Sequence, residues 1–170
     1  MGKARPPRTP EFVSEEWDNY TCPPIHVPAN YLLLIENLLD ITHFYPLHDG
    51  NIGDLANSKI PIEFIEQEVD GNPSLKTVRD VKNYKHPPFL VDWFGYDVVD
   101  RIHTHQMSNP GLTRVRLRCA PPGQLDTAAE RGYILHHSHT PIDEVSHIWR
   151  WTITVPKGQK GLDPSKTTME

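Results

Sequence analysis

Two histidines and an aspartate within one short stretch offer the clearest chemistry in this sequence. His43 and His48 are five residues apart, and Asp40 precedes His43 by three residues. On an unbroken helix, five residues rotate a side chain by about 140°, so the two imidazoles would point in different directions. Pro46 lies between them and is expected to break the helix, which lets the second imidazole fold back toward the first. The pattern predicts a metal site held by His43 and His48.

The ligand types narrow the metal only in part. Two imidazoles suit Fe, Zn, Cu or Ni, and one added carboxylate would complete the facial triad of non-haem Fe(II) oxygenases. A metal-bound histidine usually donates its second N–H to a neighbouring acceptor. Asp40 is placed to accept that hydrogen bond or to serve in a proton or electron relay.

The histidine pair follows an apolar segment that is free of Pro and Gly, residues 31–43. We expect a long buried helix here, with Asn30 as a possible N-cap. Four polar residues fall on or beside one narrow stripe of that helix, and polar groups in a core must bond to one another, to a cofactor or to a neighbouring chain. They are Glu36, Asn37, Asp40 and His43.

The rest of the chain has the alternation and the turn signals of antiparallel strands. The clearest case is Val115, Leu117 and Cys119, which alternate with arginines. A short helix or turn is expected at 86–95. The predicted strands are 62–70, 75–83, 98–107, 112–119, 131–139 and 145–155, separated by turns at 71–73, 109–111, 121–123 and 140–141. These elements indicate an α+β fold of the helix-grip (START-like) type, a partial domain in which a curved antiparallel sheet packs on a long helix.

The two ends of the chain differ from this central part. Residues 1–28 hold six of the 17 prolines and are expected to form an extended lead-in. Residues 29–155 form the predicted domain, and residues 156–170 a polar tail.

Composition excludes several function classes. The net charge of −5 provides no positive field for nucleic acid. The two cysteines, Cys22 and Cys119, are too few for a disulfide framework or a four-cysteine metal site. No apolar leader or membrane-spanning run is present. We expect a cytoplasmic protein without nucleic-acid or membrane partners.

For the other candidate polar residues, a structural role is an alternative to a functional one. His103 with His105, and His137 with His139, share strand faces and form possible second metal pairs, although pocket lining or surface positions are commoner for such histidines. Arg114, Arg116 and Arg118 either recognise a substrate carboxylate or form a solvated strand face.

Residues 29–48 resemble the catalytic-domain signature of the α subunit of Rieske non-haem iron ring-hydroxylating oxygenases. The resemblance rests on Glu36-Asn37 followed by Asp40-x-x-His43-x-x-x-x-His48. Over most of residues 29–155 the chain is similar to the phthalate and vanillate demethylase-like branch.

The resemblance implies a function and a set of roles. His43 and His48 would bind mononuclear Fe(II), Asn37 would lie near the iron, and Asp40 would bridge toward a cluster-ligating histidine of an adjacent subunit. The substrates would be O2 and an aromatic compound, which is hydroxylated or demethylated. Some of the strand histidines would line the substrate pocket, together with Phe94, Met107, Trp149 and Trp151. Electrons would come from NAD(P)H through a reductase or ferredoxin and a [2Fe–2S] domain, and the full-length protein would be a trimer-like homo-oligomer.

Two parts of the family pattern are missing from this sequence. Neither Cys22 nor Cys119 has the Cys-x-His or Cys-x-x-His spacing of the cluster ligands. After Val155 only Asp163 and Glu170 could supply the third iron ligand. We therefore expect an incomplete enzyme, inactive alone, with a non-catalytic helix-grip ligand-binding module as the alternative.

Overall fold

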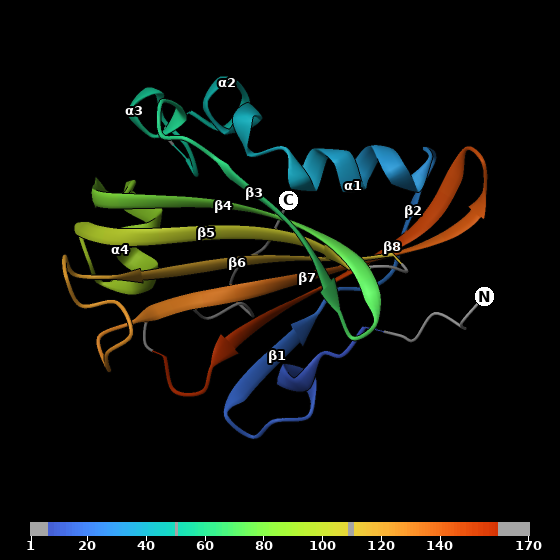
Figure 1. Ribbon diagram of the computed structural model, residues 1–170. Coiled ribbons are helices and arrows are strands. Elements are labelled where there is room, and N and C mark those ends of the chain that lie inside the picture. Colours follow the sequence, from blue (N-terminus) through green and yellow to red (C-terminus); the bar gives the residue numbers. More distant parts are fainter. Residues whose placement is uncertain (1–6, 50, 109–110, 160–170) are drawn as a thin grey trace.

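The computed structural model describes residues 7–49, 51–108 and 111–159, and its central feature is an antiparallel sheet of eight strands (Figure 1). The spatial order is β1-β8-β7-β6-β5-β4-β3, and β2 also pairs with β8. The strands are β1 (Trp17–Thr21), β2 (Ile25–Val27), β3 (Glu63–Val69), β4 (Asn72–Lys85), β5 (Val98–Ser108), β6 (Leu112–Ala120), β7 (Arg131–Asp143) and β8 (Ser146–Pro156).

Short helices surround this sheet. In Figure 1, α1, α2 and α3 lie together across one face of it. The helical elements are η1 (Pro10–Phe12), α1 (Tyr31–Leu39), η2 (Ile41–His43), α2 (Phe44–His48), α3 (Leu55–Ser58) and α4 (Pro88–Phe94). The expected α+β arrangement, a helix against an antiparallel sheet, is confirmed.

Alternation along the strands separates two faces of the sheet. Val115, Leu117 and Cys119 of β6 are buried on the face that also carries His103 and His105 of β5. We call this the inner face, and the opposite side the outer face. Because α1 and α4 both pack against the inner face, it holds the core and the histidines together.

The six predicted strands all form, but the predicted turn at 140–141 is wrong, and that at 71–73 overlaps β4, which begins at Asn72. Residues 109–110 of another predicted turn lie outside the described residues. Residues 140–141 lie inside β7, where Pro141 is opposite His147 next to an irregularity in register. Proline is tolerated at such an irregularity because no regular ladder hydrogen bond is required of it there. The strand therefore continues to Asp143, and the hairpin turns after it.

Part of the proline-rich lead-in belongs to the sheet. β1 pairs with β8 from Trp17 opposite Pro156 to Thr21 opposite Thr152, and β2 extends the same partner strand. Before β1, Phe12 packs on His136 of the outer face with ring centroids 4.6 Å apart, and Glu11 pairs with Arg114. The part of the lead-in before β1 thus covers part of the outer face.

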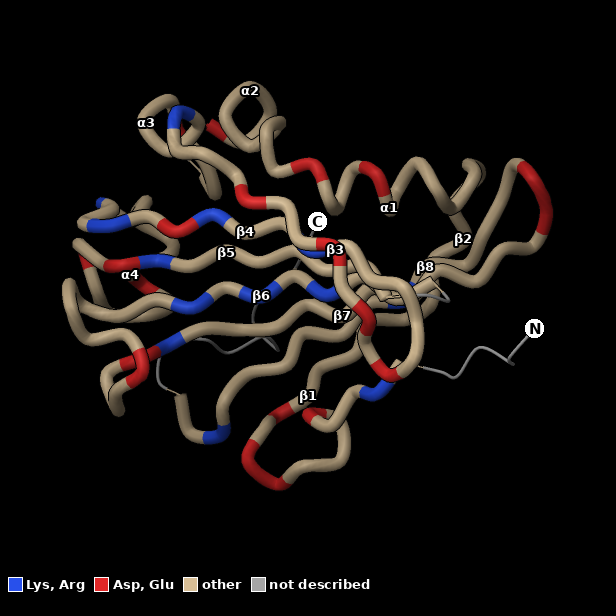
Figure 2. Tube along the Cα trace, in the orientation of Figure 1, with Lys and Arg blue, Asp and Glu red and all other residues tan. Residues whose placement is uncertain are grey.

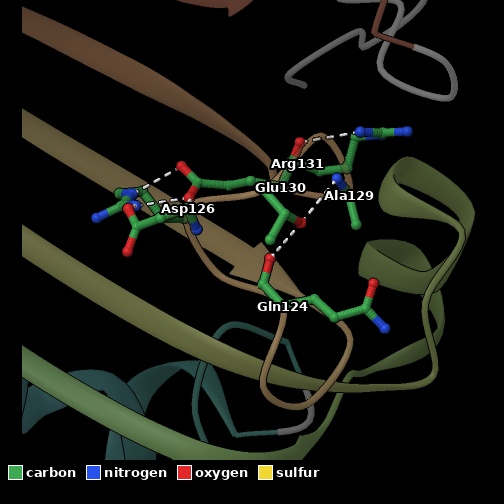
Figure 3. A network of polar contacts seen from close by, with 7 residues as sticks. Gln124, Asp126, Ala129, Glu130 and Arg131 are labelled. Atoms are coloured by element: carbon green, nitrogen blue, oxygen red, sulfur yellow. Dashed lines mark hydrogen bonds and ion pairs between the residues drawn. The ribbon is translucent and has the colours of Figure 1, made fainter.

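The connection from β6 to β7 is held by a network of polar contacts (Figure 3). Arg118 donates to both carboxylate oxygens of Glu130, at 2.7 and 2.5 Å, and also pairs with Asp126. Beyond this loop, Tyr96 donates to the carbonyl of Ala129 at 2.9 Å. These bonds tie the hairpin to the segment after α4.

No helix in the described ranges is long and apolar enough to cross a membrane.

Candidate metal centre

The helix that precedes the histidine pair is shorter than predicted. Asn30 caps α1, because its side chain accepts a hydrogen bond from the Leu32 amide at 2.9 Å. The helix ends at Leu39 rather than continuing to His43. Asp40 then has extended backbone angles, and its Oδ1 accepts hydrogen bonds from the Thr42 amide (2.8 Å) and hydroxyl (2.5 Å).

The predicted break at Pro46 is therefore wrong, and the break lies at Asp40. Pro46 lies within α2, in its first turn, where a missing N–H leaves no helical bond unmade. The Asp40 side chain competes for the local backbone donors and starts a new turn, as short polar side chains do. His43 and His48 end up at the two ends of α2, His43 as its N-cap residue and His48 as its last residue.

The structure brings the two imidazoles together. Their ring centroids are 5.4 Å apart and their planes are inclined by 61°. With metal–nitrogen bonds of about 2 Å, two imidazoles on one ion have centroids within about 6 Å of each other. The His43 Nδ1 atom is buried and has no hydrogen-bond partner among the described residues. The separation of the rings is compatible with a shared ion, and the metal site itself stays a prediction.

Phe44 seats this pair against the sheet. Its ring is buried and lies 5.2 Å from that of His43 and 6.1 Å from that of His48, between centroids. On its other side it contacts His103 and His105 of β5, at 5.5 and 5.6 Å. In the candidate centre, the Phe44 ring thus contacts both the histidine pair and the two histidines of the sheet.

The sheet histidines are uncharged. Burial lowers the pKa of His105 to about 4 and that of His103 well below its usual value. His105 Nδ1 lies within hydrogen-bond reach of the Leu38 carbonyl, so it carries the proton and leaves Nε2 as a lone pair. Among residues 7–49, 51–108 and 111–159, no group of three or more His, Cys, Asp or Glu side chains is placed to hold a metal ion. The rings of His103 and His105 lie 5.1 Å apart between centroids, so a second metal site at the sheet stays a prediction.

The expected polar stripe on α1 is exposed instead of buried. Glu36, Asn37 and Asp40 all face outward, while Ile35 supplies the buried side of the helix. The pKa of Asp40 is lowered, chiefly by the hydrogen bond from the Thr42 hydroxyl. Asp40 is therefore an ionised, accessible carboxylate next to the histidine turn.

The residues expected to line one substrate pocket lie in different parts of the structure. His137 and Trp149 stack on the inner face with centroids 5.7 Å apart, and Trp149 Nε1 donates to His137 Nδ1 at 3.2 Å. Phe94 instead packs in the hydrophobic core against Tyr133, so the pocket prediction is wrong for this residue. Met107 lines a separate 320 Å³ cavity at the β3–β4 hairpin.

Two of the three β6 arginines are engaged on the outer face, away from the histidine pair. Arg114 pairs with Glu11, and Arg118 pairs with Glu130 and Asp126. Their position favours the expected strand face over recognition of a substrate at the candidate centre. The carboxylates expected as a third ligand, Asp163 and Glu170, lie outside the described residues.

Comparison with known proteins identifies the family of this chain. The family described as the vanillate O-demethylase oxygenase C-terminal domain matches residues 27–168. The toluene-4-sulfonate monooxygenase system iron–sulfur subunit of Comamonas testosteroni is 31% identical, over 74% of this chain and 38% of its own length. The chain thus spans well under half of this relative.

Solved structures share the fold. Dicamba monooxygenase bound to dicamba gives a TM-score of 0.74 at 20% identity, covering 94% of this chain and 44% of the other. A structure of the same enzyme with non-haem iron and dicamba gives 0.67 at 18% identity, covering 98% and 45%. The match over residues 27–168 and the relative's 31% identity confirm the resemblance to a Rieske-type oxygenase catalytic domain: the chain belongs to the vanillate O-demethylase oxygenase C-terminal domain family.

Proposed function

We propose that this chain forms the iron- and substrate-binding part of an oxygenase that uses mononuclear Fe(II) and O2 to hydroxylate or demethylate an aromatic compound. The observation that carries the proposal is the 5.4 Å approach of the His43 and His48 rings at the turn after α1. The family assignment and the non-haem iron in a structural relative support it. When bound, Fe(II) supplies the redox chemistry that O2 requires before it reacts with an aromatic ring.

The side chains of this chain divide the remaining work. His43 and His48 hold the ion, and Asn37, which we assign near it, lies on the last part of α1 before the break at Asp40. On the inner face, His137 has its Nδ1 occupied by Trp149, so the neutral ring carries its proton on Nε2. We assign this buried N–H, which has no partner among the described residues, to a hydrogen bond with a substrate oxygen. Burial lowers the pKa of His137 to about 3, which keeps the ring neutral.

Electron delivery needs a second component. We assign Asp40 as the bridge to a cluster-ligating histidine of a neighbouring subunit, because it is ionised and accessible beside His43. The [2Fe–2S] cluster, reduced from NAD(P)H through a reductase or ferredoxin, lies on a segment outside this chain. The third, carboxylate ligand of the iron is likewise not among the described residues.

A groove next to Asp40 supports a subunit contact of the kind that the proposed homo-oligomer, trimer-like when full length, requires. It has a volume of about 350 Å³ and is lined mainly by apolar groups of α1, of β4 and of the segment that enters β3, including Leu39, Ile62 and Leu75. Phe64 on its wall is 68% exposed. Figure 2 shows acidic residues along α1 and β3, two of the elements that border the groove. An exposed apolar groove with a charged rim is typical of a subunit contact.

The free thiols of Cys22 and Cys119 fit the cytoplasmic location that we propose.

Anaerobic titration of the purified chain with Co(II), a spectroscopic substitute for Fe(II), tests the proposal. We expect one weakly bound equivalent, because one ligand is missing, and loss of binding in His43→Ala and in His48→Ala. His26→Ala is the matched control, since His26 is exposed on β2. Binding that survives both substitutions contradicts the proposal, and aromatic-ligand binding without metal favours a non-catalytic ligand-binding module.

A further inference from the structure

The segment that carries both histidines is held at its two ends by buried arginines. Arg79 of β4 donates from Nη1 to the carbonyl of Ile41 at 3.3 Å. Arg101 of β5 donates from Nη2 to the carbonyl of Ile52 at 3.4 Å. The two carbonyls flank His43 and His48, so each arginine meets the segment at one end.

Both arginines come from the inner face and from adjacent strands. Arg79 is opposite His103 in the sheet, and Arg101 is opposite Val81, which makes the two arginines diagonal neighbours. Their exposed fractions are 3% and 1%. A rigid sheet therefore presents two fixed donors to the turn above it.

Burying two like charges side by side is costly. Burial and then the neighbouring Arg101 lower the pKa of Arg79, and burial lowers that of Arg101. The Nε atoms of both groups have no hydrogen-bond partner among the described residues, and neither arginine has a carboxylate within ion-pair distance there. The Tyr84 ring, 4.1 Å from the Arg101 guanidinium, and the two carbonyl bonds offset part of the cost.

Between the two ends the segment is folded on itself. The amide of Asn51 donates to the His48 carbonyl at 3.0 Å, and that of Gly53 to the same carbonyl at 3.4 Å. A Cβ atom at Gly53 would lie 2.7 Å from the Phe44 backbone carbon, so only glycine permits this approach. With its middle closed and its ends fixed, the segment has little freedom to change the distance between His43 and His48.

We propose that Arg79 and Arg101 are positioning residues that fix the separation of His43 and His48 by holding the two ends of the segment 41–52. Neither arginine contacts the ion. The effect of the arginines on metal binding rests on the proposed function. Their mechanical role, which is to restrain the segment 41–52, does not. Because the two donors act at different ends, loss of each one loosens a different part of the segment.

Hydrogen–deuterium exchange of the metal-free chain tests the mechanical role. In Arg79→Met, exchange of the Thr42 and Phe44 amides should rise about tenfold, as expected for loss of one charge-assisted hydrogen bond. In Arg101→Met, the Asn51 and Gly53 amides should respond instead.

Three comparisons keep this test decisive. Amides of β6–β8 should keep their wild-type rates, since global loosening would raise all rates together. The control Arg116→Met replaces an exposed outer-face arginine and should change none of these rates. Arg79→Lys and Arg101→Lys keep the charge but lose the planar guanidinium, so exchange at the matching end should lie between that of wild type and that of the Met variants. If the Met variants do not fold, the Lys variants still give this measurement. Wild-type exchange at both ends in the folded Met variants overturns the proposal, and so does wild-type exchange in the Lys variants when the Met variants are unfolded. A uniform rise across the sheet also overturns it.

The Co(II) absorption spectrum gives a second readout. In the Met variants we expect shifted d–d bands and an affinity reduced about tenfold or more, with the Lys variants between wild type and the Met variants. If wild type itself binds no metal, the proposed function fails while the exchange result still decides the role of the arginines. An unshifted spectrum with unchanged affinity in both Met variants contradicts positioning.

Discussion

At the residue scale, neutral buried histidines are the strongest source of pH dependence in this protein. Burial lowers the pKa of His86, His136 and His139 to about 4, and that of His137 to about 3. In the unfolded chain each of these groups binds its proton near pH 6.5. Between those pH values the unfolded state carries more protons than the folded state, so acid favours unfolding.

We therefore predict that these histidines contribute fully to the free energy of unfolding above about pH 6.5, and that this contribution falls as the pH drops toward 4. Each histidine contributes a slope of up to about 1.4 kcal/mol per pH unit in that window. Urea unfolding at several pH values measures the slope, and His139→Asn should reduce it by one group's share. Equal stability at pH 7 and pH 5 would show that these rings are not held neutral.

Asp40 separates local structure from electron transfer. In Asp40→Asn the amide oxygen still accepts the bonds from Thr42, so the turn after α1 and the Co(II) affinity should be unchanged. Coupled turnover should drop sharply in an enzyme that also holds the cluster-bearing domain, because the bridging charge is lost. A loss of metal with normal turnover per bound metal would contradict the assignment of Asp40 as a bridge.

At the element scale, local side-chain hydrogen bonds decide where helices end and loops close. Sequence reasoning predicted Asn30 as a cap correctly, since the same residue type performs that role in many helices. It placed the helix break at Pro46 because proline is the strongest general breaker. The break at Asp40 depends on two hydrogen bonds from Thr42, which residue types alone do not rank above a proline.

The loop between β6 and β7 offers a test of such bonds. Glu130 accepts from Arg118 with both oxygens, and its pKa is lowered chiefly by that contact. Glu130→Gln should cost about 1 kcal/mol in the free energy of unfolding, with a smaller cost at high salt because part of the attraction is screened. Thermal unfolding of both proteins at low and high salt measures this. An unchanged melting temperature at low salt would show that the network in Figure 3 does not stabilise the loop.

At the scale of the whole molecule, alternation and turn residues were enough to predict most of the sheet. The β6 strand shows why: Val115, Leu117 and Cys119 occupy one face and are all buried. The buried arginines were missed because an arginine in an alternating strand ordinarily indicates the solvent face. Arg79 and Arg101 are inside only because carbonyls from a distant turn accept their hydrogen bonds, and that pairing is not encoded locally.

Prediction of the candidate centre from the sequence has the same limit. The spacing of His43 and His48 predicted a shared site, and the structure brings the rings together by a different helix break. The sheet histidines that support Phe44 come from β5, about 60 residues later in the chain. Only folding of the whole sheet reveals that second layer.

X-ray absorption spectroscopy of the Co(II)-loaded chain tests the central claim most directly, because outer-shell scattering counts the imidazoles bound to the metal. The account predicts two imidazole nitrogens at about 2 Å in the wild-type chain and one in His48→Ala. A spectrum without imidazole scattering, or one that is identical in wild type and His48→Ala, would contradict a metal centre at this turn.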